Sequence, residues 1–154
     1  MTYLLDTNVL IFMLRGLKSR AHPTERQRDR HKLAVRLLQR AQNEQLSGNQ
    51  VALSAITVAE LEYGAWNSGD YAKESDVVRR AITPFTLLSF DAGDCAAYYG
   101  KIRHALESSG QGIGSLDTLI AAHALALGAT VVTSDTAEFS RVPGLKCEDW
   151  AAGD

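Results

Sequence analysis

Residues Ser115–Asp135 read SLDTLIAAHALALGATVVTSD and contain the pattern that decides the fold. The first half is apolar enough to form a buried helix. Gly128 stands where a helix commonly ends, because glycine adopts the left-handed conformation without steric cost. Thr130–Thr133 then supplies β-branched residues typical of a buried strand. A helix that leads directly into such a strand predicts one unit of an alternating α/β fold.

The same alternation extends along the chain in both directions. Short apolar runs predict further strands, and apolar residues at helical spacing predict the helices between them. The predicted strands are residues 3–5, 51–53, 85–89, 130–133 and a short edge strand at 145–147, and the predicted helices are residues 8–14, 33–46, 57–66, 77–82, 94–107 and 115–127. Strands that alternate with helices favour a parallel sheet covered on both faces, so the predicted fold class is α/β.

Length and composition are those of one globular domain, and we predict a single domain over residues 1–154. Apolar residues make up 45% of the chain and charged residues 22%, which is ordinary for a globular protein. No apolar run approaches the roughly 20 residues that span a bilayer, and the N-terminus lacks the basic segment of a signal peptide. Cys95 and Cys147 match no metal-binding or redox spacing. These features predict a cytoplasmic protein without a membrane partner.

The net charge of −2 conceals a basic segment. Eight of the 16 Lys and Arg residues lie between Leu17 and Arg40, opposed only by Glu25 and Asp29. A basic segment on an otherwise acidic chain indicates a polyanionic or acidic partner, although a solvated helix face has the same composition.

Four acidic residues are expected at one edge of the predicted sheet. Asp6 directly follows the first strand and Asp135 follows the fourth, while Glu60 and Asp117 lie near the starts of the helices after strand two and before strand four. Ligands bind outside the carboxyl ends of parallel strands, so these four carboxylates are predicted to converge there.

Carboxylates packed together repel one another, and a hard divalent cation removes that conflict. Mg²⁺ prefers oxygen ligands, whereas zinc sites usually include His or Cys. A water molecule bound to such a metal is a usable nucleophile near neutral pH, which suits hydrolysis of a phosphodiester. The sequence contains no recognisable Ser-His-Asp or Cys-His arrangement and no glycine-rich phosphate loop.

Each acid also has a structural interpretation. Thr57 and Glu60 have the spacing of a capping box, Asp117 in a first helical turn favours the helix dipole, Asp6 can cap the helix that follows, and Asp135 can be a turn residue. Two further interpretations concern other residues. His123 is expected in the core or at a dimer interface rather than in the site, and Tyr63 and Trp66 are expected to pack in the core rather than stack on a base.

These segments resemble the PIN-domain nucleases and, within them, the VapC-type toxins of bacterial toxin–antitoxin pairs. The resemblance is carried by YLLDTNVLI at residues 3–11, SAITVAELEYG at 54–64, SLDTLIAAHA at 115–124 and LGATVVTSD at 127–135. It covers nearly the whole chain except about residues 17–47. The four motifs in order, at this length, are specific to the family.

The resemblance implies a three-layer α/β/α sandwich with a central parallel sheet and Mg²⁺ or Mn²⁺ at the acid cluster. Asp6, Glu60, Asp117 and Asp135 match the family's acidic positions, although many relatives carry Asn in place of Asp135. Thr133 matches a hydroxyl that supports the site by hydrogen bonding, and Asn8 is expected to help it. The resemblance also implies cleavage of RNA, often transfer RNA, a homodimer, and a cognate VapB-type antitoxin.

The stretch between Asp6 and Glu60 is longer than usual for the family, and we interpret residues 17–47 as a basic, partly helical insertion. Within it, Arg26, Arg28, Arg30 and Lys32 are predicted to bind the RNA backbone. The insertion could instead contact the antitoxin or form a disordered arm.

Three other functions fit parts of the pattern. A catalytically inactive PIN-fold module would bind RNA or protein. Such a module would not need to retain the four acids, whereas this chain has an acidic residue at all four positions. A phosphatase with an aspartyl nucleophile usually has a second Asp two residues after the first, where this chain has Asn8. A PIN nuclease of RNA processing would act without an antitoxin.

Overall fold

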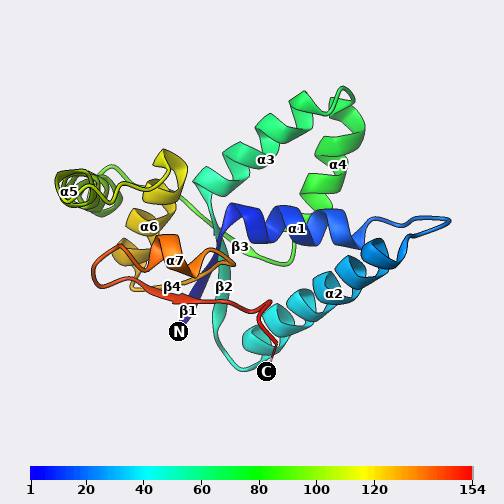
Figure 1. Ribbon diagram of the computed structural model, residues 1–154. Coiled ribbons are helices and arrows are strands. Elements are labelled where there is room, and N and C mark those ends of the chain that lie inside the picture. Colours follow the sequence, from blue (N-terminus) through cyan, green and yellow to red (C-terminus); the bar gives the residue numbers. More distant parts are fainter. Residues whose placement is uncertain (154) are drawn as a thin grey trace.

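The computed structural model describes residues 1–153 and contains a five-stranded sheet with helices on both sides (Figure 1). The elements in chain order are β1 (Thr2–Leu5), α1 (Thr7–Leu17), α2 (Glu25–Leu46), β2 (Gln50–Ser54), α3 (Ala55–Asn67), α4 (Tyr71–Ile82), β3 (Thr86–Leu88), α5 (Asp94–Ser108), α6 (Ser115–Leu127), β4 (Thr130–Val132), α7 (Thr136–Phe139) and β5 (Lys146–Glu148).

The strands are ordered β3-β2-β1-β4-β5, and every neighbouring pair is parallel. The predicted α/β class and parallel sheet are confirmed. The connections from β1 to β2 and from β4 to β5 run toward opposite edges of the sheet. The switch point of the sheet therefore lies between the carboxyl ends of β1 and β4, where open α/β sheets commonly form a ligand-binding crevice.

Alternate residues of the strands supply two separate cores. Tyr3, Leu5 and Val132 point to one face, where they pack with residues of α1 and α2. Leu4 and Val131 point to the other face and pack with residues of α5 and α6. This is the two-residue period of a strand buried on both sides, and it explains why the strands read as continuous apolar runs. Figure 1 shows α1 and α2 on one side of the sheet and α5 and α6 on the other.

Three helices differ most from the sequence prediction, and one of them is α4, which begins at Tyr71 and not at residue 77. The prediction placed the start of α2 at residue 33, but α2 begins at Glu25, after a capping box. The Thr24 hydroxyl accepts a hydrogen bond from the N–H of Gln27 at 3.2 Å, and the Gln27 side chain accepts one from the N–H of Thr24 at 2.9 Å. Its first two turns are polar and carry no apolar stripe, so only the capping box signalled them. The short helix α7 was not predicted at all.

Glycine at position 16 lets α1 and α2 approach closely. A Cβ added there would lie 2.6 Å from the Cβ of Ala34 and 2.9 Å from the carbonyl oxygen of Arg30. The Gly16 carbonyl also lies 2.9 Å from Nδ1 of His31, at hydrogen-bond distance. The end of α1 is therefore held tightly against α2.

Across residues 1–153, no helix has both the length and the apolar character required to cross a membrane. Cys95 and Cys147 are both free thiols, and Cys95 is buried.

Candidate active site

Asp6 is buried at the end of β1, with 2% of its surface exposed. Its backbone N–H donates to the carbonyl of Val132 at 2.9 Å, which fixes it beside the end of β4. Oδ2 accepts a 3.0 Å hydrogen bond from the hydroxyl of Thr133, but Oδ1 is buried without any hydrogen-bond partner. Burial raises the pKa of the Asp6 carboxyl, and the Thr133 hydrogen bond, together with the nearby backbone N–H groups of Thr7 and Asn8, opposes that shift only in part. Asp6 occupies the N-cap position of α1, but its side chain makes no capping hydrogen bond.

Thr133 connects Asp6 to Asp135. Its hydroxyl also accepts a 3.0 Å hydrogen bond from the backbone N–H of Asp135. The hydrogen bond predicted for Thr133 is thus present. Asp135 is exposed and caps α7, where its Oδ1 accepts from the N–H of Glu138 at 3.1 Å. The structural role considered for Asp135 is therefore real, and it positions the carboxylate beyond the carboxyl end of β4.

Asp117 lies half-buried in the first turn of α6. Burial raises the pKa of its carboxyl, and the negative charges of Asp6 and Asp135 raise it further. Three of the four predicted acids therefore lie close enough to affect one another electrostatically. Like charges held together in this way are a feature of sites that bind cations or handle protons.

A fourth acid at this position, Glu138 on α7, was missed by sequence reasoning. Its Oε1 accepts a 3.0 Å hydrogen bond from the N–H of Gly114, directly before α6. That bond favours the charged form, but a shared hydrogen bond with Asp135, burial and the charge of Asp117 outweigh it and raise the pKa of Glu138. The available signal was the spacing Asp135-x-x-Glu138, which marks an N-cap and a first-turn acid.

Glu60 is not among the charges that shift the pKa of Asp6 or Asp117. It is half-buried on α3, and within residues 1–153 its side chain makes no hydrogen bond or ion pair. The capping box considered for Thr57 and Glu60 is wrong, because α3 begins earlier, at Ala55, and is capped by the Ser54 hydroxyl. The Thr57 hydroxyl instead lies 2.9 Å from that of Thr7. Glu60 is therefore left without a structural role.

The acids offer only oxygen atoms as potential metal ligands. In the described part of the chain, no three His, Cys, Asp or Glu side chains form a ready-made ligand set for a metal ion. The donor chemistry nevertheless fits a hard cation, because every acid here offers oxygen and none of the neighbours is His or Cys. The unpartnered Oδ1 of Asp6 is a buried acceptor that a cation would satisfy.

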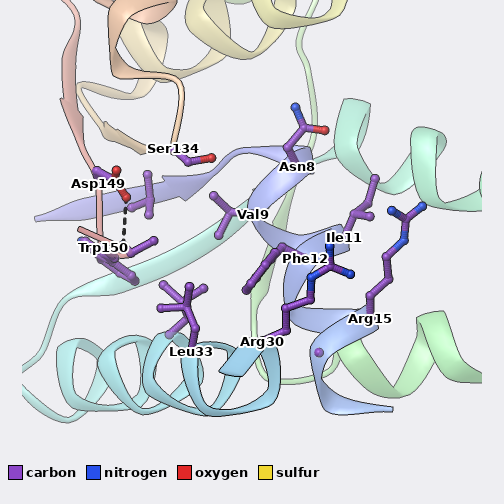
Figure 2. Close-up of a pocket in the computed structure, with 14 residues that line it drawn as sticks. Asn8, Val9, Ile11, Phe12, Arg15, Arg30, Leu33, Ser134, Asp149 and Trp150 are labelled. Carbon is purple, nitrogen blue, oxygen red and sulfur yellow. Dashed lines mark hydrogen bonds between the residues drawn. The ribbon is translucent and has the colours of Figure 1, made fainter. Parts of the chain in front are cut away.

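Asn8 is exposed on the first turn of α1 and lines a pocket of about 460 Å³ between α1, α2 and the C-terminal segment (Figure 2). We call this the α1–α2 pocket. Apolar side chains, including Val9, Phe12 and Leu33, form much of its lining. Arg15 and Arg30 lie at the end of the pocket opposite Ser134. Asn8 makes no side-chain hydrogen bond to the acids.

The predicted RNA-binding residues are exposed on the first turns of α2 and do not lie in a disordered arm. These residues are Arg26, Arg28, Arg30 and Lys32. Arg28, Arg30 and Lys32 line a second hollow of about 580 Å³, which we call the basic hollow. Its lining includes six Lys or Arg residues and no Asp or Glu.

His123 is a core residue, as expected. It is 1% exposed, and its Nδ1 lies 2.8 Å from the Ser54 hydroxyl. The core packing expected for Tyr63 and Trp66 is wrong, since they are 67% and 68% exposed. The ring of Trp66 stacks on that of Tyr71 at a centroid distance of 4.1 Å.

Comparison with known proteins agrees with the motifs. The model of the PIN domain matches residues 3–145. The chain is 33% identical over 150 residues to a protein of Rickettsia felis named "Ribonuclease VapC2", with 97% of this chain and 98% of that protein covered. It is 31% identical over 149 residues to the "tRNA(fMet)-specific endonuclease VapC" of Shigella flexneri, with the same coverage of each.

A solved structure has the same fold over nearly its whole length. It is the DNA-bound VapBC of Salmonella typhimurium, with a TM-score of 0.79, 30% identity, and coverage of 97% of this chain and 98% of the other. The three-layer PIN-like architecture and the resemblance predicted from the sequence are confirmed. This chain therefore belongs to the PIN-domain family and, within it, to the VapC-type proteins.

Proposed function

We propose that this protein is a metal-dependent endoribonuclease and the toxin of a VapBC-type toxin–antitoxin pair. The observation that carries the proposal is the buried Asp6 carboxylate, whose Oδ1 has no partner although Asp117 lies close enough to interact with it. An unpaired buried charge is costly and persists where a ligand or a reaction uses it. The names of the relatives as ribonucleases support the same activity.

Mg²⁺ or Mn²⁺ is the proposed cofactor. Asp6, Asp117 and Asp135 would hold it, with Glu60 completing the set and Glu138 bordering it. When bound, such a cation makes water a better nucleophile and stabilises the negative charge that develops on a phosphate. Thr133 orients the Asp6 carboxylate through its hydrogen bond to Oδ2. Asn8 is proposed to help position the substrate beside these acids.

Proton transfer falls to a carboxylate with a raised pKa. Glu138 fits this role, because its pKa lies above the ordinary value and its Oε1 is held by the Gly114 amide. Its other oxygen would accept a proton from the water as the water oxygen bonds to phosphorus. The bond from phosphorus to the leaving ribose oxygen breaks in the same step, and that oxygen takes a proton from solvent.

The proposed substrate is RNA, and one relative's name as an endonuclease specific for tRNA(fMet) makes transfer RNA the first to test. The exposed cations of α2, Arg26, Arg28, Arg30 and Lys32, would bind the phosphate backbone. Because the neighbouring solved structures are VapBC complexes, we further propose a VapB-type antitoxin as partner, together with a homodimer and a cytoplasmic location.

The test is cleavage of total RNA and of purified transfer RNA by the protein with Mg²⁺, with EDTA, and as the Asp6→Asn variant. Asp76→Asn is the matched control, since Asp76 is an acid on α4 that, within residues 1–153, forms ion pairs only with Arg79 and Arg80. We expect discrete products that require Mg²⁺ and Asp6 and are unchanged in the control.

Cleavage that survives both EDTA and Asp6→Asn would refute the proposed site. RNA binding without any cleavage would favour an inactive binding module. The antitoxin role is tested separately: a short DNA-binding protein encoded beside this gene should co-purify with the chain and inhibit cleavage. Without such a partner, a nuclease of RNA processing would be the better description.

A further inference from the structure

The α1–α2 pocket adjoins the basic hollow at one end and is lined at the other end by residues close in sequence to the acids. At one end it is lined by Asn8, two residues beyond Asp6, and by Ser134, the neighbour of Asp135. At the other end Arg15, Gly16 and Arg30 line both the pocket and the basic hollow. Asn8 and Arg15 are separated by about 10 Å along the helix axis, from a rise of 1.5 Å per residue. This length suits a nucleotide with a flanking phosphate.

The wall and the far end of the pocket differ in chemistry. Phe12 and Leu33 present apolar surface from α1 and α2, and both are half-buried (Figure 2). Arg15 and Arg30 are exposed and, within residues 1–153, their guanidinium groups make no ion pair or hydrogen bond. A flat apolar wall followed by two free guanidinium groups matches a base followed by a phosphate.

The other polar side chains of the pocket are occupied in part, and Oδ2 of Asp149 makes no hydrogen bond within residues 1–153. Oδ1 of Asp149 accepts hydrogen bonds from the N–H groups of Ala151 and Ala152 at 2.8 and 3.2 Å. The indole N–H of Trp150 donates to Glu148 at 2.9 Å. The groups left to recognise a ligand are therefore the Asn8 amide, the Ser134 hydroxyl, Oδ2 of Asp149 and the two arginines, so the free cations outnumber the one carboxylate. Because the adjoining basic hollow has no acidic lining, a polyanion fits this path better than a peptide of mixed charge.

We propose that the α1–α2 pocket is a nucleotide subsite of the enzyme. It receives the unpaired base next to the phosphate that is cleaved, with Phe12 stacking on the base. Arg15 and Arg30 bind the next phosphate and direct the RNA strand into the basic hollow. This inference rests on the proposed ribonuclease function and adds that the enzyme reads its substrate as a single strand at this point.

The test measures binding of a trinucleotide with 2′-O-methyl sugars and a central 2-aminopurine, a fluorescent base that is quenched by stacking. It uses the Asp6→Asn protein with Mg²⁺ present, so that no cleavage is needed. The test variants add Arg15→Gln with Arg30→Gln, or Phe12→Leu, which keeps an apolar side chain but removes the ring. Arg36→Gln is the matched control, an exposed cation of α2 that lines neither the pocket nor the basic hollow. Thermal unfolding verifies that each variant is folded.

We expect the double arginine variant to lose about tenfold or more in affinity, the effect of one strong charge-assisted contact. Phe12→Leu should abolish the quenching, and Arg36→Gln should leave both affinity and quenching unchanged. Equal binding and quenching by all variants would overturn the inference. The inference would also be overturned if the double arginine variant lost binding of the antitoxin but still bound the trinucleotide. In that case the pocket would bind a peptide and not a nucleotide.

The two proposals fail separately. Mg²⁺-dependent RNA cleavage by the unmodified protein, with no effect of the pocket variants, would retain the nuclease and remove the subsite. Pocket-dependent binding of the trinucleotide, with no cleavage of any RNA, would retain a nucleotide-binding pocket and remove the enzyme.

Discussion

The hydroxyl of Thr133 donates a 3.0 Å hydrogen bond to Oδ2 of Asp6, across 127 positions of sequence. The other oxygen of the same carboxylate is buried and has no partner. One half of Asp6 is therefore fixed by the protein, and the other half is left for a ligand. Several predictions about stability and activity depend on this asymmetry.

Replacing Asp6 with Asn should stabilise the protein in the absence of metal. The substitution replaces a buried charged oxygen by a neutral amide atom, and an unsatisfied buried group, which costs about 1–3 kcal/mol when neutral, costs more when it is charged. Chemical denaturation near neutral pH in EDTA should show a higher free energy of unfolding for Asp6→Asn. Added Mg²⁺ should stabilise the original protein and not the variant, since only the former binds the ion. Equal stability of the two proteins in EDTA would mean that the carboxylate is satisfied in solution.

The stability difference between these two proteins should depend on pH. Burial raises the pKa of Asp6 in the folded state, so between the unfolded and folded pKa values the native protein binds the extra proton. The stability that this proton contributes is fully present below about pH 4, the pKa of an Asp in the unfolded chain. It is lost as the pH rises through the higher pKa of Asp6 in the folded protein. The advantage of Asp6→Asn in EDTA should therefore widen from acid to neutral pH. Urea unfolding at several pH values measures it, and a gap that narrows would contradict the pKa direction.

Thr133→Val should reduce both stability and cleavage. Valine has nearly the same shape but cannot donate to Asp6 or accept from the Asp135 N–H. Loss of these bonds at buried groups should destabilise the fold by about 1–3 kcal/mol. Thr133→Ser keeps the hydroxyl and should retain most of the cleavage. If serine and valine lower the cleavage rate equally, packing of the methyl group matters more than the hydrogen bond.

Gly16→Ala should destabilise the protein, although alanine is the better helix former. The added Cβ would collide with Ala34 and with the Arg30 carbonyl, and such overpacking typically costs about 1–3 kcal/mol. Gly64→Ala in α3 is the control, because nothing lies within 4 Å of a Cβ there. That substitution should stabilise by about 0.5–1 kcal/mol. Thermal unfolding of both variants tests the contact, and stabilisation by both would show that α1 and α2 separate easily.

Neutralising Arg26, Arg28, Arg30 and Lys32 together should weaken RNA binding and flatten its dependence on salt. Each phosphate contact contributes about 0.7 to the slope of log affinity against log salt for single strands, so the slope should fall by about 3. Filter binding at several salt concentrations, with the Asp6→Asn protein to prevent cleavage, measures this slope. An unchanged slope would assign the basic segment to another partner.

Most of the fold was predictable because its signals are local. Strands such as Tyr3–Leu5 are continuous apolar runs, and Gly128 ends α6 in the left-handed conformation, with a φ of 64°. The start of α2 was not predictable from hydrophobic periodicity, since Glu25–Lys32 has almost no apolar residue to reveal a buried face. The single domain over residues 1–154 and the insertion at 17–47 remain predictions.

The candidate site was predictable only in part. Asp6 and Asp135 follow strands directly, so the topology alone brings them to one edge of the sheet. Glu138 was missed because it depends on α7, a helix of one turn that leaves little trace in the sequence. The unpartnered oxygen of Asp6 depends on three-dimensional packing and has no sequence signal.

The strand order has a consequence for synthesis of the protein. β4 lies beside β1 in the sheet, yet it is made after more than four-fifths of the chain. Until β4 leaves the ribosome, β1 has an open edge, Asp6 has no Thr133 to hold it, and Asp117 and Asp135 are not yet assembled around it. A nascent chain of this topology has no active centre until β4 joins β1, so the proposed nuclease cannot attack RNA before that strand has emerged.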